Sequence, residues 1–201
     1  MLSHEGVRRK ITRSRLFVIS GPSGAGKGTI VQGLLLRSPS VSVSVSYTTR
    51  PPRPTERHGV HYYFVSKAEF AAMRDRGEFL EWAEVHGNWY GTHRETVARA
   101  LAEGRDVLLE IDVQGAAQVK RHLADSVLIF IEAPSLAELE RRLRRRRTEQ
   151  EDALSRRLSA AYFELRSRHA FDGVVVNTDI DRAVEEVLQI MEKARHSDTD
   201  T

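Results

Sequence analysis

Short apolar runs alternate along most of the chain with longer stretches in which apolar and polar positions are mixed. The runs have the length and β-branched content of strands that are buried on both faces, and we expect such strands at residues 16–20, 107–112, 127–131 and 174–176. Helices are expected at residues 27–37, 95–103, 135–147, 150–168 and 181–194. Strands that alternate with helices predict an open, parallel three-layer α/β sheet.

The segment between residues 41 and 94 follows a different pattern. Val41, Val43 and Val45 alternate with serines, which is typical of a strand. Residues 47–59 are rich in Pro and Arg, and we expect them to be irregular because prolines prevent regular pairing. Further strands are expected at residues 62–65, 78–84 and 88–90, the last two joined by His86-Gly87. Between the first two of these, Ser66 and Glu69 have the spacing of a capping box that begins a helix.

The composition limits the classes of protein that the chain can represent. Its 201 residues suit one sizeable domain, and the lack of cysteine excludes disulfides, thiolate metal sites and cysteine nucleophiles. The N-terminal apolar run of about four residues is too short for a signal peptide or membrane helix, so we expect a cytoplasmic protein without a membrane partner. The net charge of +3 is mild, and the arginines cluster locally, which favours small anion sites over nucleic acid. Residues 1–14 and 196–201 are interpreted as a flexible leader and tail.

The most informative stretch follows the first apolar run. It reads Gly21-Pro22-Ser23-Gly24-Ala25-Gly26-Lys27-Gly28-Thr29. A strand, then glycines, then a lysine and a helix is the pattern of a phosphate loop, in which backbone N–H groups and the helix N-terminus form a concave anion site. The alternative, a glycine-rich turn without chemistry, is disfavoured by this context. Gly28 stands where a phosphate loop usually carries a Ser or Thr for magnesium, and the hydroxyl comes one residue later, at Thr29.

Two acids mark the end of the strand at residues 107–112. Glu110 and Asp112 are two residues apart and would lie on the same face, near the phosphates. Carboxylates there can hold Mg²⁺ or its water ligands. The alternative for each is a structural role, for Glu110 a buried hydrogen bond.

The arginines of the chain form two sets. Arg50 and Arg53 lie in the Pro-rich segment, and Arg142, Arg146 and Arg157 lie in a later one, the first two on one helix face. Arginine binds phosphate oxygens bidentately, which suits phosphoryl transfer. The neighbouring Arg144, Arg145 and Arg147 are interpreted as a solvated face.

Several motifs occur in an order and spacing that resemble those of guanylate kinases over residues 16–194. The matches are Thr48-Thr49-Arg50 with Arg53, Glu56, Gly59, Tyr62 and Phe64, residues 77–82, Tyr90-Gly91-Thr92, residues 110–115 and Arg146-Arg147-Thr148-Glu149. The resemblance implies one domain over residues 15–195, with a core (15–45, 95–140 and 158–195), a GMP-binding insertion (46–94) and a helical lid (141–157).

The resemblance also implies roles for individual residues. Ser46, Glu81 and Thr92 match the positions that read guanine, and Arg50, Arg53, Tyr62 and Tyr90 match those that bind the GMP phosphate. Glu56 is interpreted as an orienting partner of the arginines, Asp112 as a further substrate contact, and Asn177 as a neighbour of the ATP adenine. Lys27, Arg50, Arg142, Arg146 and Arg157 would be catalytic. Without the resemblance, Tyr62 and Tyr90 could equally be core aromatics with a solvated hydroxyl.

The activity that the resemblance implies is transfer of the ATP γ-phosphoryl group to GMP, with Mg²⁺, by a monomer or homodimer. dGMP is a second candidate acceptor. Chemistry supports Glu81 separately, because a carboxylate can accept the adjacent N1–H and N2–H donors of guanine, whereas adenine presents an acceptor at N1. Two alternatives are another nucleoside monophosphate kinase and a non-catalytic scaffold domain that binds phosphopeptides. Glu81 opposes the first; Lys27 and the lid arginines oppose the second.

Overall fold

The computed structural model describes residues 14–85, 87–145 and 151–196. Five strands form a sheet in the order β2-β7-β1-β8-β9, and every neighbouring pair is parallel. Their bounds are β1 (Leu16–Ser20), β2 (Val41–Val43), β7 (Asp106–Glu110), β8 (Val127–Glu132) and β9 (Gly173–Val176). The prediction of an open parallel α/β sheet is confirmed.

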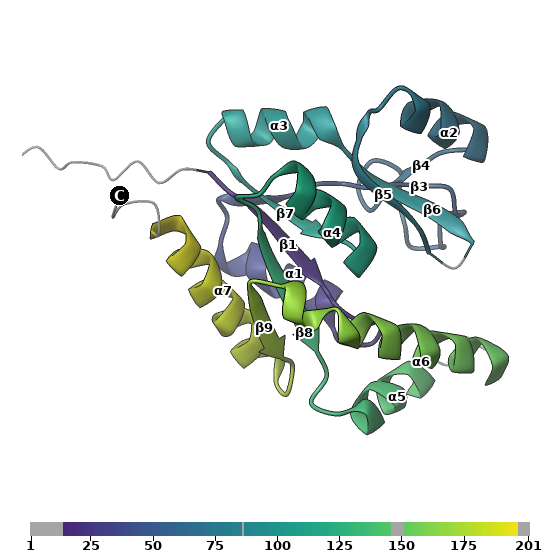
Figure 1. Cartoon of the computed structure of the whole chain (residues 1–201), viewed down its shortest axis with the longest axis vertical. Helices are drawn as coiled ribbons and strands as arrows, with labels where there is room; N and C mark the ends of the chain where they lie inside the picture. The colour runs from purple at the N-terminus through teal and green to yellow at the C-terminus, as the bar shows by residue number, and fades with distance from the viewer. Residues whose placement is uncertain (1–13, 86, 146–150, 197–201) are drawn as a thin grey trace, which may run out of the picture.

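Helices cover both faces of this sheet (Figure 1). Helices α1 (Lys27–Arg37) and α7 (Ile180–His196) pack on one face, and α3 (Arg94–Ala102) and α4 (Val113–His122) on the other. Within β1, Phe17 and Ile19 join the first apolar cluster, whereas Leu16 and Val18 join the second. A strand covered on both faces needs apolar residues at successive positions, which explains the unbroken run in the sequence. Among the described helices, none is both long and apolar enough to cross a membrane.

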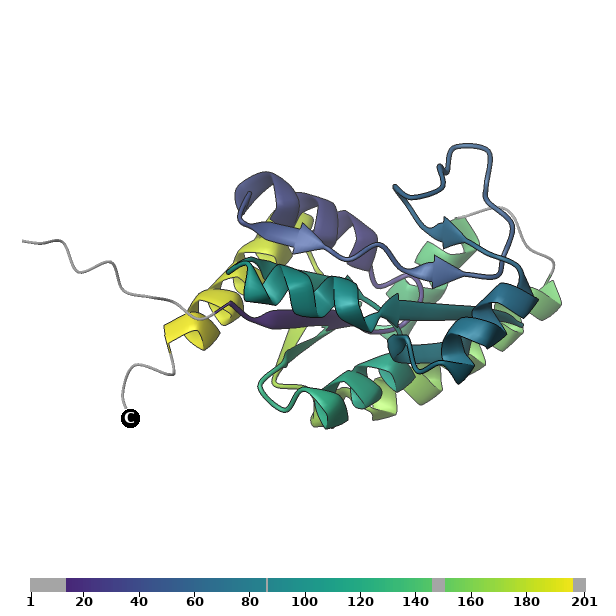
Figure 2. The same cartoon turned by 90° about the horizontal axis from the view of Figure 1, so that it is seen from above.

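A second, mixed sheet lies beyond one end of the parallel sheet (Figure 1, Figure 2). Its strand order is β4-β3-β6-β5, with β3 parallel to β4 and the other pairs antiparallel. Ser66 and Glu69 form the predicted capping box at the start of α2. The elements are β3 (Tyr47–Thr48), β4 (Tyr63–Phe64), α2 (Lys67–Asp75), β5 (Phe79–Val85) and β6 (Asn88–His93).

Two helices form a third unit beside the parallel sheet. They are α5 (Leu136–Arg145) and α6 (Glu151–Arg166), and a 3-10 turn, η1 (Arg168–Ala170), follows. The Ser135 hydroxyl accepts the Glu138 N–H at 3.1 Å, as expected of a cap. Leu139, Leu143 and Ala161 pack into a small apolar cluster of their own. The predicted extension of the first helix to residue 147 falls on 146–150, outside the described residues.

Two predictions of local structure were wrong. Residues 47–59 were expected to be irregular, but Tyr47 and Thr48 form β3, because the first proline, Pro51, comes only after them. The Tyr47 ring stacks on Tyr63 at 4.7 Å, and Thr48 is fully buried.

Helix α4 was not predicted at all. Its buried positions are small, Gly115, Ala116 and Val119, so its apolar face gives a weak periodic signal. Asp112, for which a structural role was the alternative to ligand binding, is its N-cap, because its Oδ1 accepts the Gly115 N–H at 2.8 Å.

The outer edge of the mixed sheet is bound by a side chain. β5 lies at the end of the strand order, so one of its edges has no neighbouring strand. The Gln118 side chain of α4 donates to the Trp82 carbonyl (2.7 Å) and accepts the Trp82 N–H (3.2 Å). One amide side chain thus makes the two bonds that a neighbouring strand would make.

Asp106 joins the beginning of the chain to its last helix. It is 8% exposed, accepts the Arg15 N–H at 2.8 Å and pairs with the Arg195 guanidinium at 2.7 Å. We predict that Asp106→Asn lowers the free energy of unfolding by about 2 kcal/mol, because the variant leaves the half-buried Arg195 guanidinium without its buried counter-charge. Chemical denaturation measures this change. Glu192→Gln is the matched control, since Glu192 is the exposed second partner of Arg195, and its effect should stay below about 0.5 kcal/mol. Equal effects of the two variants would contradict the prediction.

Candidate active site

The glycine-rich segment between β1 and α1 forms a loop that leaves the helix N-terminus open. Gly26 is the N-cap of α1, with a φ of 94°, and neither a capping side chain nor an acidic residue lies in the first turn. A Cβ at Gly26 would lie 2.3 Å from Nδ2 of Asn177, so only glycine fits. The uncapped N–H groups and the helix dipole make this position an anion site.

The lysine of the loop bonds to the loop itself. Lys27 Nζ donates to the carbonyl oxygens of Gly21 (2.6 Å) and Pro22 (3.2 Å). Asn177, at the end of β9, donates from its side-chain amide to the Ala25 carbonyl at 2.7 Å. These bonds hold the loop in its curled form.

A cavity of about 280 Å³ opens beside the loop and extends to the mixed sheet. It brings together most of the site residues that the sequence singled out, although they come from distant parts of the chain. Its walls include Gly21, Ser23, Gly24, Gly26, Lys27, Gly28, Ser46, Tyr62, Glu81, Tyr90, Glu110, Asp112 and Arg157.

Glu81 is a buried carboxylate in the wall of this cavity. It is 3% exposed and accepts a hydrogen bond from the Thr92 hydroxyl at 2.6 Å. Thr92 is the residue directly opposite Glu81 in the β5–β6 pairing. Burial raises the pKa of Glu81 to about 7, and the charge of Asp112 adds to this, whereas the Thr92 bonds oppose it. A carboxylate held in this way has a strong need for further N–H donors, which a ligand can supply.

The two acids at the end of β7 line the cavity together with the loop. A Cβ at Gly28 would lie 3.6 Å from Oε2 of Glu110, so Glu110 is next to the position of the missing hydroxyl. One oxygen of Asp112 caps α4, and burial raises the pKa of this carboxyl. Among the described residues, no group of three or more His, Asp or Glu side chains is arranged to hold a metal ion.

Arg50 is held by Glu56. The guanidinium donates twice to the carboxylate, at 2.6 and 2.7 Å, and lies 5.0 Å from the centre of the Tyr62 ring. The Arg50 hydrogen bonds lower the pKa of Glu56 to about 2, and a bond from the Arg53 backbone N–H assists. Glu56 therefore has the geometry of an orienting partner, as the sequence suggested.

The predicted tyrosines face the cavity. The Tyr62 and Tyr90 rings meet edge to face at 6.0 Å, and burial raises the pKa of Tyr62. Both line the cavity wall.

The arginines of α5 and α6 that were predicted for a lid bind two different places. Arg157 donates to the Ser23 hydroxyl at 2.6 Å, whereas Arg142 donates to Glu138 (2.7 Å) and to the Asn177 carbonyl (3.0 Å). Arg144 forms an exposed pair with Glu140, in agreement with its interpretation as a solvated position.

Several predicted residues lie outside the cavity wall. The Arg50 guanidinium lies over the Tyr62 ring and binds Glu56, and the Thr92 hydroxyl binds Glu81. Arg142 donates to the carbonyl of Asn177. Thr29 is exposed, as is Arg53. Pro22, Ala25, Thr29 and Arg53 do not line the cavity. Arg146 lies outside the described residues.

One functional candidate was missed. Glu164 of α6 lines the same cavity, although no motif contains it. Burial raises its pKa to about 7, with Lys27 opposing and Asp112 adding to the effect. Its only sequence signal is the seven-residue separation from Arg157, which places the two on one helix face.

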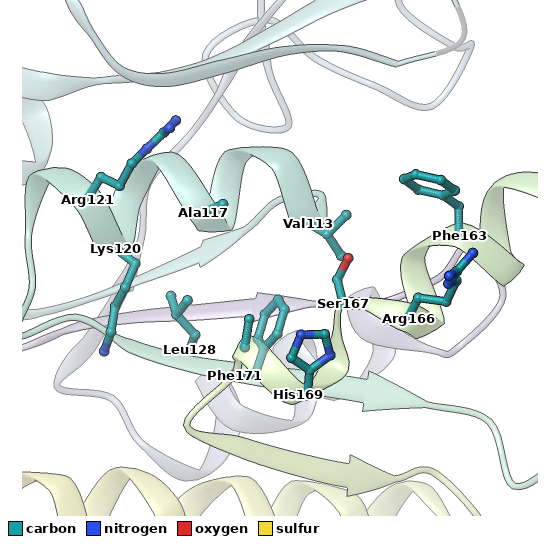
Figure 3. A pocket seen from close by; sticks show the side chains of 11 residues that line it. Val113, Ala117, Lys120, Arg121, Leu128, Phe163, Arg166, Ser167, His169 and Phe171 are labelled. Carbon is teal, nitrogen blue, oxygen red and sulfur yellow. The ribbon is translucent and has the colours of Figure 1, made fainter.

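A second cavity, of about 740 Å³, lies on another side of α6 (Figure 3). It is lined by α4, by the end of α6 and by η1, with Phe171 and Leu128 at its base and Phe163 and Arg166 at one side. None of the residues predicted for the site lines it, so it is separate from the cavity at the phosphate loop.

A parallel sheet with a phosphate loop after its first strand, opening into a cavity with charged side chains in its wall, defines the class of phosphate-loop nucleotide-binding proteins. The sequence pattern of the guanylate kinase family matches residues 13–194. Guanylate kinase of Aromatoleum aromaticum is 53% identical over 180 residues, covering 90% of this chain and 88% of that protein. Guanylate kinase of Synechococcus sp. is 49% identical over 187 residues, with 93% and 86% covered.

A solved structure agrees with the sequence matches. The crystal structure of guanylate kinase from Anaplasma phagocytophilum superimposes with a TM-score of 0.78 at 34% identity, covering 92% of this chain and 88% of that one. The chain belongs to the guanylate kinase family.

The raised pKa of Glu81 makes stability depend on pH. Because the folded state holds this proton more tightly than the unfolded state, stability falls as the pH rises from about 4.5 to about 7. We predict that Glu81→Gln, which keeps the acceptor for Thr92 without the charge, stabilises the ligand-free protein at pH 8 by on the order of 2 kcal/mol. Denaturation at pH 5 and pH 8 measures the effect.

Glu84→Gln is the control, because Glu84 is exposed on the same strand. A gain in the Glu81 variant that is equal at both pH values, or a loss at pH 8, would contradict the assignment.

Proposed function

We propose that this chain transfers the γ-phosphoryl group of ATP to GMP, giving ADP and GDP, and catalyses the reverse reaction in the same site. The observation that carries this proposal is that Glu81 and the phosphate loop line one cavity. A carboxylate suited to guanine thus faces an anion site suited to phosphates. The proposal also includes the division into a core, a GMP-binding insertion over residues 46–94 and a lid over residues 141–157.

Glu81 recognises the base. Its carboxylate accepts N1–H and N2–H of guanine. The Thr92 hydroxyl holds this carboxylate in place, and Ser46 lines the same cavity. Adenine would turn a lone pair toward Glu81 and leave the buried charge without donors, which is costly. The raised pKa of Glu81 in the free protein fits this role, because guanine supplies the donors that stabilise the charged form.

The GMP phosphate is held by Arg50, Arg53, Tyr62 and Tyr90. Arg50 is oriented before the substrate arrives, since Glu56 binds both of its terminal nitrogens. A preset guanidinium loses little freedom on binding, so more of its interaction contributes to alignment.

The donor phosphates occupy the loop. The loop N–H groups and Lys27 bind them, and Lys27 exchanges its bonds to the loop carbonyls for bonds to phosphate. Arg142 and Arg157, with Arg146 as a further member of the set, neutralise charge on the transferring group. No covalent intermediate is needed, because in-line transfer requires alignment and charge stabilisation.

Magnesium is included in this proposal as a metal held mainly by phosphates and water. With Gly28 lacking a hydroxyl, Glu110 and Asp112 are the side chains suited to bind its water ligands. One exposed and one half-buried carboxylate beside the loop fit such an outer role better than direct ligation by several acids. When bound, Mg²⁺ supplies neutralisation of the phosphate oxygens.

A coupled ADP-release assay with GMP, AMP, CMP and UMP tests the proposed acceptor. We expect GMP to be the preferred acceptor, and Glu81→Gln to reduce the GMP-over-AMP ratio at least ~100-fold, since a site built on hydrogen bonds loses discrimination steeply. The affinity for ATP should change little.

Glu84→Gln is again the control. No ADP release with any acceptor would refute the enzyme and favour the phosphopeptide-binding alternative. AMP preferred by the native protein would favour another monophosphate kinase.

Closure of the lid and insertion over both substrates is a further expectation. Water competes as an acceptor, so the arginines should converge only when both nucleotides are bound. Small-angle scattering should show a smaller radius of gyration with GMP plus a non-hydrolysable ATP analogue than with either ligand alone. An unchanged radius would contradict closure.

A further inference from the structure

Gly115 is a glycine inside a regular helix, at a position where the backbone does not require one. It lies in the first turn of α4 and is buried, and it is not among the glycines with a positive φ. Glycine is a poor helix former, because it loses more conformational freedom on folding than alanine does. A glycine at such a position points to a reason outside the helix, in the group that lies next to it.

The group next to Gly115 is the carboxylate that the proposed mechanism assigns to guanine. A Cβ at Gly115 would lie 2.4 Å from Oε2 of Glu81, whereas ordinary van der Waals contacts begin at about 3.4 Å. A methyl group at this position would force the oxygen or the helix to move by about 1 Å. The space that Oε2 occupies therefore exists because Gly115 has no side chain.

Two sets of hydrogen bonds hold α4 at its distance from β5. Gln118 lies one turn after Gly115, on the same side of the helix. Its side chain binds both backbone polar groups of Trp82, the residue that follows Glu81. At the start of the helix, Asp112 accepts the Gly115 N–H at 2.8 Å. Because α4 is fixed in this way, an added methyl group would displace the carboxylate more readily than the helix.

A second contact restricts the same carboxylate. Oε1 of Glu81 accepts a hydrogen bond from the Thr92 hydroxyl at 2.6 Å, and Glu81 is 3% exposed. With Thr92 bound to one oxygen and Gly115 packed against the other, the positions of both oxygens are restricted before a ligand arrives. Two parallel bonds to N1–H and N2–H of guanine need this, because hydrogen bonds weaken steeply when the acceptor leaves the direction of the donor.

We propose that Gly115 is a specificity-determining position of the guanine site: because it has no side chain, Oε2 of Glu81 reaches the place at which it accepts an N–H of guanine. Gly115 acts through Glu81, so it is a positioning residue and need not touch GMP. This inference rests on the proposed transfer to GMP. A group misplaced by about 1 Å can cost about 100-fold in rate, so a single methyl group suffices for a large effect.

The first test compares four proteins in the coupled ADP-release assay: the native chain, Gly115→Ala, Glu81→Ala and the double variant. We expect Gly115→Ala alone to lower the GMP-over-AMP ratio of kcat/KM at least ~10-fold, while the KM for ATP stays within about threefold. In Glu81→Ala the methyl group has no carboxylate to displace, so adding Gly115→Ala should change the ratio less than about twofold. Ala117→Ser is the control and should behave as the native protein, because Ala117 is exposed on α4 and lines the second cavity.

Thermal melting of the same four proteins tests the contact without any activity. Alanine favours a helix over glycine, so the added methyl group should raise the melting temperature wherever there is room for it. We expect Gly115→Ala to lower the melting temperature of the native chain and to raise that of Glu81→Ala. Such a reversal of sign requires that the methyl group and the Glu81 side chain compete for the same space.

Three results would overturn the proposal. They are an unchanged GMP-over-AMP ratio in Gly115→Ala, an equal loss of this ratio with and without Glu81, and a melting shift of the same sign in both backgrounds. If Gly115→Ala does not fold, the double variant decides: it should fold and melt above Glu81→Ala, and its failure to do so would contradict the proposal. An inactive native protein would instead refute the proposed function, while the melting comparison would still test the contact, so the two failures are distinguishable.

Discussion

The site depends on the shape of the phosphate loop, and the hydrogen bond from the Asn177 side chain to the Ala25 carbonyl holds that loop in place. Asn177 is 1% exposed, so leaving either group without its partner would cost the full desolvation of a buried polar group. The same residue donates its backbone N–H to Glu132 and accepts Arg142 at its carbonyl. The hydrogen bonds of this one residue thus connect the edge of the parallel sheet, the phosphate loop and helix α5. The loop is therefore shaped before any phosphate arrives.

Charges in the site are handled in two opposite ways. Arg50 binds Glu56 and lowers its pKa to about 2, and Arg141 together with Arg142 lowers the pKa of Glu138 to about 2; these bonds fix the guanidinium groups in place. Glu81 and Glu164 are instead removed from water, which raises the pKa of each to about 7. Paired cations suit the binding of phosphates, whereas a desolvated acid suits the binding of N–H donors.

What could be predicted from the sequence was local in origin. The buried strand at Leu16–Ser20, the loop after it and the capping box at Ser66 each depend on a few neighbouring residues, and the structure has them where the pattern placed them. Helix α4 was missed because its packed face is made of small residues. The place of Glu164 in the cavity wall beside Lys27 and the Asn177–Ala25 hydrogen bond could not be derived, since both pairs of residues are more than 100 positions apart in the sequence. The roles assigned to Arg50 and Glu81 came from a resemblance and remain predictions to be tested by activity.

The side-chain amide of Gln118 has a consequence for the behaviour of the protein at high concentration. A sheet edge with open backbone groups is a template on which another polypeptide can add a strand, and this is a common start of aggregation. At Trp82 that template is already occupied by Gln118, from a helix of the same molecule. The longest strand of the mixed sheet is thereby protected in its middle, and the insertion can carry an outer strand without charged residues at that point and without recruiting a second chain.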